Sequence, residues 1–155
     1  MCRFLWKQEV KMIEQDTIKL LRECDAGIRM GVASIDEVRD LAQNVGLRSA
    51  LTECKSKHEK LKDELQQALD RFGDEGKAPN PVAKGMSWLK TNVRLGFDTS
   101  DATIADLMTD GCNMGIKSLS RYLNEYRAAD ENAKALTRKL IAQETQLVTQ
   151  MQQFL

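Results

Sequence analysis

The chain has a single histidine, His58, and it could share its chemistry with thiol and carboxylate groups elsewhere in the sequence. Imidazole nitrogen, thiolate sulfur and carboxylate oxygen are protein ligands of transition metals, and the same groups act as bases and nucleophiles. One interpretation is therefore a mononuclear metal site or small-ligand site that uses His58 with Cys54, Glu59 or Glu144. A Cys-His or Ser-His-Asp site would also have to use His58. Each of these sites depends on where the helices place His58.

The residues around His58 follow a helical pattern. From residue 47 to residue 72, apolar side chains recur every three or four positions, and His58 falls on this stripe. A similar stripe covers residues 17–44, and Gly73 is well placed to end the second helix. Because the connection between the two stripes is short, we expect an antiparallel hairpin with His58 buried.

A buried neutral imidazole needs a hydrogen-bond partner for its N–H group. Gln143 occupies the matching stripe position on the last predicted helix, which runs from residue 131 to the C-terminus. The preferred interpretation is a buried contact between His58 and Gln143 that fixes the register of the two helices.

The second half of the chain repeats the pattern of the first. Ser100 and Asp130 are typical N-cap residues, and they predict helices from about residue 101 to residue 129 and from residue 131 onward. Residues 112–127 match residues 24–39 at five of sixteen positions. The identical pairs are Cys24 with Cys112, Gly27 with Gly115, Ile28 with Ile116, Glu37 with Glu125, and Arg39 with Arg127. The chain is therefore expected to contain two matching hairpins.

The repeated cysteines and glycines can be interpreted as packing residues. Cys24 and Cys112 hold equivalent stripe positions and are expected to be small buried fillers, with a redox pair as the alternative. Gly27, Gly31 and Gly115 each lower helix stability by about 1 kcal/mol relative to Ala. Close approach of another helix backbone is the simplest compensation, and a ligand cleft beside the glycines is the alternative.

The segment between the hairpins is rich in Pro and Gly and leads into a predicted crossover helix at residues 81–96. Asn80 is a plausible N-cap and Pro81 suits the first helical position. The apolar face of this helix is expected to pack over the bundle. The residues that would instead form a partner or membrane surface are Trp88, Lys84, Lys90 and Arg94.

Composition narrows the classes of function. Lys plus Arg and Asp plus Glu both total 23, so the chain has no net charge to attract nucleic acid. The four cysteines include no Cys-x-x-Cys pair, which argues against a zinc site and favours a reducing cytoplasm. No apolar run reaches the roughly 20 residues that cross a bilayer. The sequence also lacks a P-loop, a dinucleotide-binding glycine motif and a nucleophile elbow.

The order of hairpin, crossover and hairpin, with the stretches GKAPNPVAKGMSWLK and TIADLMTDGCNMGIKSL, resembles the ferritin-like superfamily, in particular its small, uncharacterised bacterial four-helix-bundle members. The resemblance implies an all-α ferritin-like four-helix bundle of two pseudo-repeated antiparallel hairpins, with a long helical crossover between the second and third helices. In metal-binding members each half supplies a Glu and a Glu-x-x-His motif. Here Lys55 stands where the Glu before His58 is needed, and Leu140 and Gln143 hold the corresponding places in the second half. The di-iron ligand set is therefore absent.

These observations favour a non-catalytic scaffold or interaction protein without a cofactor, which acts through its helix faces as a homo-oligomer or with a protein partner. The alternative is a metal-binding protein, for iron storage or oxidoreduction, with a non-standard site near His58. Residues 1–11 are expected to be a disordered extension, or a segment upstream of a true start at Met12, because residues 8–12 can be encoded by a ribosome-binding sequence followed by ATG. The bundle domain is expected to span residues 12–155.

Overall fold

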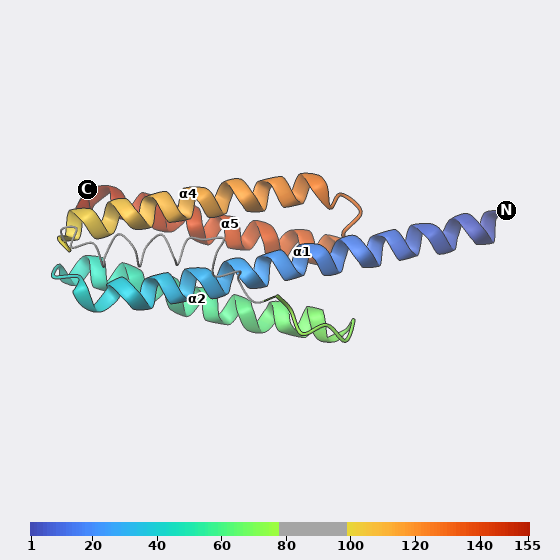
Figure 1. Cartoon of the computed structure of the whole chain (residues 1–155), viewed down its shortest axis with the longest axis horizontal. Helices are drawn as coiled ribbons and strands as arrows, with labels where there is room; N and C mark the ends of the chain where they lie inside the picture. Colours follow the sequence, from blue (N-terminus) through green and yellow to red (C-terminus); the bar gives the residue numbers. More distant parts are fainter. Residues whose placement is uncertain (78–98) are drawn as a thin grey trace.

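The computed structural model describes residues 1–77 and 99–155, and their regular structure is entirely helical (Figure 1). The long helices are α1 (Cys2–Val38), α2 (Val45–Asp70), α4 (Asp101–Glu125) and α5 (Glu131–Met151), with short 3-10 turns at Arg39–Leu41 and Gln152–Phe154. The all-α prediction is confirmed for this part of the chain. The predicted crossover helix at 81–96, with Lys84, Trp88, Lys90 and Arg94, lies outside the described residues.

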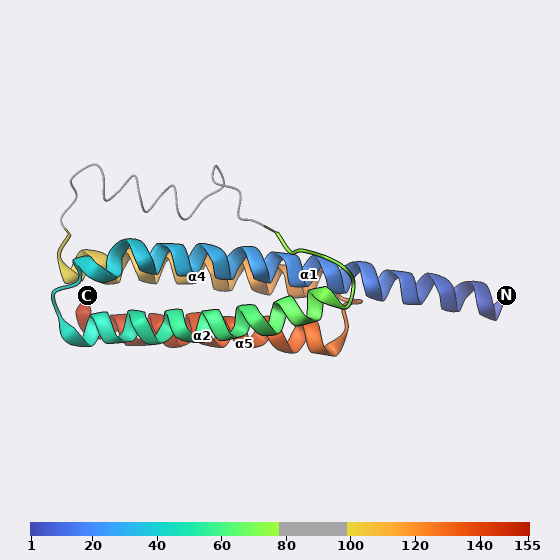
Figure 2. The same ribbon diagram turned by 90° about the horizontal axis from the view of Figure 1, so that it is seen from below.

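The four long helices of the described ranges form a bundle. Figure 1 shows α1 and α2 as one antiparallel hairpin and α4 and α5 as a second. Figure 2 shows that α1 and α4 lie in one layer, while α2 and α5 lie in the other. None of the helices in these ranges is long and apolar enough to span a lipid bilayer.

Local side chains cap the helices where the sequence predicts. The Ser100 hydroxyl accepts a hydrogen bond from the Thr103 N–H at 3.2 Å, and the Asp130 carboxylate accepts one from the Ala133 N–H at 2.8 Å. Gly73 has a φ of 66°, and its N–H donates to the carbonyl of the last residue of α2 at 3.1 Å. These three residues are therefore helix caps, as predicted.

The first connection is tied to the second hairpin by Asp101. Its two carboxylate oxygens accept hydrogen bonds from the backbone N–H groups of Gln43, at 2.7 Å, and Asn44, at 2.9 Å. Asn44 in turn caps α2, which begins two residues earlier than the apolar stripe indicates. At the other end of the bundle, α4 stops at Glu125 instead of near residue 129.

Buried apolar side chains form two separate clusters along the bundle. The cluster nearer the α1–α2 connection contains Ile35, Val38, Ala42, Leu47, Ala50, Leu51, Cys54, Ile104, Ala105, Met108, Cys112, Leu147 and Met151. The other contains Leu20, Leu21, Cys24, Ile28, Leu61, Leu65, Ala68, Leu69, Leu119, Ala129, Ala133, Leu136 and Leu140. The level between them holds the buried polar residues His58 and Glu144.

The two repeat cysteines are buried fillers of different clusters. Cys24 lies in the second cluster, where its sulfur is 3.2 Å from the Thr137 hydroxyl oxygen, and Cys112 lies in the first. All four cysteines of the chain are free thiols. The predicted filler role is confirmed, and the alternative of a redox pair between Cys24 and Cys112 is wrong, because pseudo-equivalent positions in the sequence lie at different levels of the bundle.

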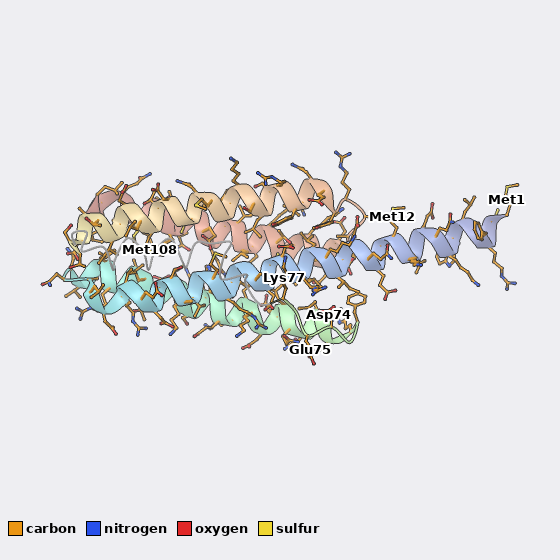
Figure 3. The ribbon with its side chains drawn as sticks, in the orientation of Figure 1. Met1, Met12, Asp74, Glu75, Lys77 and Met108 are labelled. Carbon is orange, nitrogen blue, oxygen red and sulfur yellow. The ribbon has the colours of Figure 1, made fainter. Side chains whose placement is uncertain are left out.

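The first turns of α1 project beyond the bundle, and the side chains of residues 1–15 are exposed. Figure 3 shows Met1 at the tip of this projection and Met12 near the point where α1 meets the other helices. Disorder was expected for residues 1–11, whereas the structure continues the helix through them. A helix can extend without tertiary contacts because its hydrogen bonds join residues four positions apart. A translation start at Met12 stays a prediction.

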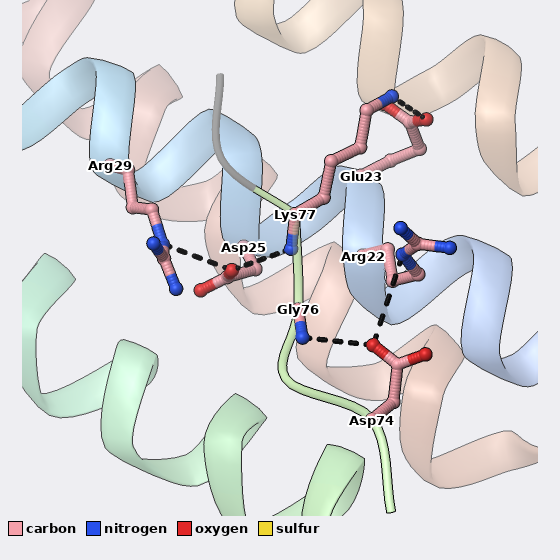
Figure 4. Close-up of polar contacts among 7 residues, drawn as sticks. All are labelled: Arg22, Glu23, Asp25, Arg29, Asp74, Gly76 and Lys77. Atoms are coloured by element: carbon pink, nitrogen blue, oxygen red, sulfur yellow. Dashed lines mark hydrogen bonds and ion pairs between the residues drawn. The ribbon is translucent and has the colours of Figure 1, made fainter. Parts of the chain in front are cut away.

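The segment that follows α2 is fastened to α1 by Asp25 (Figure 4). The buried carboxylate of Asp25 accepts a hydrogen bond from the Lys77 N–H at 3.0 Å and lies 3.0 Å from the Arg29 guanidinium. The Lys77 ammonium also pairs with the Glu23 carboxylate at 2.6 Å. Gly76 has a φ of 88°, and a Cβ atom there would collide with the Asp25 carboxylate. Glycine is therefore required at this turn.

Candidate functional site

The polar level in the middle of the bundle is built from His58 on α2 and Glu144 on α5. The Nε2–H of His58 donates to Oε1 of Glu144 at 2.9 Å. The His58 side chain is 1% exposed and the Glu144 side chain 12% exposed. This pair therefore lies almost wholly outside bulk water, where each charge depends on its partner.

Gln143, the predicted partner of His58, bonds to the backbone instead of to the imidazole, so the predicted contact is wrong. Its side-chain amide donates to the backbone carbonyl of Lys57 at 3.4 Å and lies beside the His58–Glu144 pair. The buried stripe of α5 passes through Leu140, Glu144 and Leu147. Spacings of three and four residues admit either position 143 or position 144 between Leu140 and Leu147, and the stripe alone therefore could not choose between them.

Cys54 contacts the other nitrogen of the same imidazole. Its sulfur lies 3.6 Å from Nδ1 of His58, one helical turn away on α2. Burial is the largest influence on the His58 pKa and lowers it. Hydrogen bonds to Cys54 and Glu144, with electrostatic attraction from both, outweigh burial and raise the pKa to about 10. At neutral pH the ring therefore carries its extra proton between a sulfur and a carboxylate.

Cys112 on α4 approaches the same carboxylate from the opposite side of the bundle. Burial raises the pKa of its thiol far above the ordinary value, and the charge of Glu144 and a hydrogen bond to Glu144 raise it further. The Cys112 thiol is therefore protonated and donates to Glu144. Side chains from α2, α5 and α4 are linked in this way across the middle of the bundle.

A cavity of about 360 Å³ lies beside these groups, between α1 and α4. Its lining on α1 runs from Glu23 to Ile35, and on α4 from Leu107 to Tyr122. At a helical rise of 1.5 Å per residue, each stretch is about 20 Å long, so the cavity is long and narrow. It reaches the surface at exposed residues of α4, among them Gly111 and Met114.

Most of the cavity wall is apolar or lacks a side chain. The apolar lining includes Met30, Ile35, Leu107, Met108, Leu119, Leu140 and Leu147, and the glycines are Gly27, Gly31, Gly111 and Gly115. The polar groups at its centre are Cys54, His58, Cys112 and Glu144. One end is polar as well, where Lys77 and Glu23 form their ion pair.

Among the residues that the structure describes, the glycines do not mark a close approach of two helix backbones. A Cβ atom at Gly111 would meet nothing within 4 Å, and one at Gly27 would meet only a Leu140 methyl group at 3.9 Å. At Gly31 a Cβ would lie 3.2 Å from the His58 ring, and at Gly115 it would lie 3.4 Å from a Glu144 oxygen. Within residues 1–77 and 99–155, the predicted backbone contact is not found at these positions. Gly31 and Gly115 make room for the polar pair, and Gly27 and Gly111 line open space.

Gly111 was missed as a site residue, although the sequence contains a signal for it. Gly27 and Gly31 on α1 are separated by three residues, and Gly111 and Gly115 on α4 have the same spacing. Equal spacing on two neighbouring helices places a strip without side chains on each. The repeat alignment hid this match, because it pairs Gly27 with Gly115 and leaves Gly31 and Gly111 without a glycine partner.

The metal candidates are only partly brought together. Cys54, His58 and Glu144 meet, but the sulfur and the carboxylate lie on opposite edges of the ring and cannot share one ion through it. Glu59 is exposed and pairs with Lys55 at 3.9 Å, because residues adjacent in a helix point in different directions. In residues 1–77 and 99–155, no group of three or more His, Cys, Asp and Glu side chains is placed to hold a metal ion.

The chain was also compared with known proteins. No protein-family model, no curated protein and no solved structure matches it. A function for this chain therefore has to be inferred from its own cavity and the polar groups that line it.

Proposed function

We propose that this four-helix bundle binds a small, mainly apolar molecule in the cavity between α1 and α4, with the polar group of that molecule against the His58–Glu144 pair. The observation that carries the proposal is a cavity of about 360 Å³ that contains a buried ion pair. Ligand sites in proteins typically measure about 300–1,000 Å³ and combine apolar walls with a few polar groups. The narrow shape favours a slender molecule over a bulky fused-ring cofactor.

The glycines support this role because they lower the stability of the empty protein. Each mid-helix glycine costs about 1 kcal/mol relative to alanine. At Gly27 and Gly111 the described helices leave room for the extra carbon atom, so packing among these helices does not explain the two glycines. Features that reduce stability without a packing reason are typical of binding sites, where function opposes stability.

The His58–Glu144 pair supports the same role. Replacing a buried ion pair with apolar residues of similar volume is often neutral or stabilising, so stability alone does not favour the pair. In this bundle the pair also separates two apolar clusters that could otherwise form one core. A polar ligand group beside Glu144 and His58 provides a reason for both features.

The resemblance to the ferritin-like superfamily is part of this proposal. Two antiparallel hairpins, related by the repeat of residues 24–39 and 112–127, support it. Members that bind metal do so between their helices, where this chain has its cavity. A cytoplasmic location is proposed on the basis of the four free thiols. Iron or another transition metal near His58 is the alternative occupant, and analysis of the purified protein for bound Fe, Mn and Zn would detect it.

A protein-partner role, the function favoured by the sequence, has one observation of its own. The projecting turns of α1 expose large apolar side chains: Phe4, Leu5, Trp6, Val10, Met12 and Ile13. If this segment joins two copies of the chain, light scattering will give a dimer mass that falls to the monomer mass after Phe4→Ser and Trp6→Ser. A monomer mass for the unmodified protein would exclude self-association by this surface at the concentration used.

Titration with a slender, uncharged fluorescent probe, 1,6-diphenyl-1,3,5-hexatriene, tests the ligand cavity. The expected result is saturable binding of one probe per chain and a rise in the melting temperature, because a ligand that binds only the native state stabilises it. Gly111→Leu should abolish this binding by filling the cavity. Asp110→Leu is the matched control, because it adds the same side chain at the adjacent exposed position, which does not line the cavity. Equal binding by both variants would contradict the proposal.

A further inference from the structure

We infer that Cys54 is a nucleophilic cysteine that forms a covalent bond with an electrophilic ligand in the cavity. In this arrangement His58 takes the thiol proton of Cys54, and Glu144 orients the His58 ring. The inference rests on the proposed ligand cavity and adds a chemical class to it: an uncharged, slender molecule with a carbon–carbon double bond conjugated to a carbonyl group. Neither the metal interpretation nor the scaffold interpretation includes such a reaction.

Cys54, His58 and Glu144 lie in the spatial order that an activated nucleophile requires. The thiol sulfur of Cys54 lies 3.6 Å from Nδ1 of His58, and Nε2 of the same ring lies 2.9 Å from Oε1 of Glu144. Because the carboxylate can only accept, it fixes a proton on Nε2 and leaves Nδ1 facing the sulfur. A nucleophile, a base and a group that orients the base therefore follow one another across the ring.

The ring is also held in place mechanically. Cys54 and His58 are one turn apart on α2, and helical spacing keeps their side chains on one face. The backbone of α1 lies against the ring at Gly31, where even a Cβ atom would come within 3.2 Å of it. The imidazole therefore has little room to turn away from Cys54.

The charge state of the ring favours transfer of the thiol proton. The pKa of His58 is raised to about 10, chiefly because hydrogen bonds to Cys54 and Glu144 outweigh the effect of burial, which lowers it. In the proposed pair, the extra proton on the ring at neutral pH is the one taken from the Cys54 thiol, and the ring holds it until the ligand carbon receives it. In the described part of the chain, the titratable groups that face the ring are Cys54 on its own helix and Glu144 on α5, with the Cys112 thiol of α4 behind Glu144.

The other three cysteines lack this arrangement. Cys112 lines the cavity but faces a carboxylate, and burial followed by the charge of Glu144 raises its pKa and keeps it protonated. Burial raises the pKa of Cys24 to about 12, and its sulfur contacts Thr137 away from the cavity. Cys2 is exposed on the projecting part of α1. Since His58 is the only histidine in the chain, only Cys54 has an imidazole base beside it.

The proposed step balances without an oxidant or reductant. The electron pair of the Cys54 sulfur forms a bond to the terminal carbon of the double bond, and the π bond breaks. Its electrons move toward the carbonyl group, and the carbon next to that carbonyl receives the proton that His58 took from the thiol. The products are a thioether on Cys54 and a neutral imidazole still bonded to Glu144. Acyl transfer would need N–H donors for an oxyanion, whereas the backbone N–H groups of the described lining residues are inside helices or, at Lys77, bonded to Asp25.

The test measures the reaction of each thiol with N-ethylmaleimide in a Cys2→Ser background, which removes the exposed thiol. Peptide mapping by mass spectrometry should locate one adduct, on Cys54, under native conditions. Its rate constant should change little between about pH 6 and pH 8, whereas an ordinary thiol with a pKa of about 8.5 reacts faster as the pH rises. A first adduct on Cys112 or Cys24, or a Cys54 rate that rises like that of an ordinary thiol, would overturn the inference.

Two variants test the roles of the partners. His58→Gln can still donate to Glu144 but cannot take a proton, so it should slow the Cys54 reaction by at least about tenfold at pH 7 and restore an ordinary pH profile. Glu144→Gln should slow it as well, because the ring loses the group that orients it. Circular dichroism and melting curves verify that each variant is folded. An unchanged rate in folded His58→Gln would refute the role of the base, and if neither variant folds, the adduct site and pH profile of the parent protein decide.

Probe binding separates this inference from the proposed function. If 1,6-diphenyl-1,3,5-hexatriene binds at one site but Cys54 reacts as an ordinary thiol, the cavity binds ligands and the nucleophile is refuted. If Cys54 reacts as expected but no probe binds, the nucleophile stands and the apolar-ligand site is refuted. N-ethylsuccinimide, which has the shape of the maleimide without its double bond, should leave the protein mass unchanged in either case.

Discussion

Replacing Glu144 with Gln is expected to lower the pKa of His58 and to remove part of the stability of the bundle. In the unmodified protein this pKa is raised from 6.5 to about 10. At about 1.36 kcal/mol per pKa unit, the difference corresponds to on the order of 5 kcal/mol of preference for the protonated ring in the folded state. Glutamine keeps the shape of the side chain but removes its charge. Since Cys54 still contacts the ring, we expect a loss of about 3 kcal/mol, in the range for one partner of a buried pair.

The dependence on pH follows from the direction of the shift. Because the folded-state pKa of His58 lies above the unfolded-state value, the folded protein holds the extra proton more tightly. The stabilisation is complete below about pH 6.5 and is lost as the pH rises through about 10. The stability difference between the unmodified protein and Glu144→Gln should therefore be largest at pH 6 to 7 and shrink toward pH 10.

Two measurements test this expectation. His58 is the only histidine, so its ring gives one NMR signal that needs no assignment against other histidines. This signal should not titrate between pH 5 and pH 8 in the unmodified protein and should titrate at lower pH in Glu144→Gln. Urea unfolding at several pH values gives the accompanying stability difference. A midpoint near 6.5 in the unmodified protein, or no change on substitution, would refute the assignment of Glu144 as the partner that raises the pKa.

Three further substitutions test the fold around the cavity, each by urea unfolding. Gly111→Ala should stabilise the bundle by about 1 kcal/mol, because the added carbon meets nothing within 4 Å; a destabilised variant would mean that the cavity is closed there. Gly76→Ala should destabilise it by more than about 1 kcal/mol, because a Cβ atom would collide with Asp25 at a positive φ. Asp101→Ala should cost about 1 kcal/mol, because two exposed N–H groups of the first connection lose the carboxylate that ties them to α4; an effect below about 0.3 kcal/mol would show that water replaces it.

Sequence patterns predicted most of the fold because its signals are local. Ser100, Asp130 and Gly73 each act on the backbone within a few residues, so their caps could be recognised without tertiary information. The starting point of α2 was not predicted from the apolar stripe, because Asn44 caps the helix three residues before its first buried side chain, Leu47. The two-cluster core was not predicted, since an apolar stripe gives no indication of where packing along it is interrupted.

The sequence identified His58 and Cys54 as neighbours on a buried stripe, but it did not identify Glu144 as the preferred partner of His58 or predict the cavity. His58 falls on a stripe and could be identified as buried, and Cys54 follows from one-turn spacing on the same helix. Glu144 was named only as an alternative, because a carboxylate on a buried stripe is disfavoured unless a cation faces it, and that cation lies on another helix. The cavity could not be derived from Gly27 or Gly31, because a glycine permits both close helix packing and open space.

The repeat within the chain leads to one site, not two. Aligning the second helices of the hairpins places His58 over Gln143 and Glu59 over Glu144. If the two halves contributed equally, His58 would face Gln143, and Glu59 would be as buried as Glu144. Instead, Glu59 is exposed, Gln143 bonds to the backbone of Lys57, and of the two α5 residues it is Glu144 that bonds to the imidazole. The matching hairpins supply the glycine walls on both sides of the cavity, whereas Cys54 and His58 come from α2 alone and Glu144 comes from α5. We therefore expect one ligand per chain in the probe titration, and two equivalent sites would contradict this assignment.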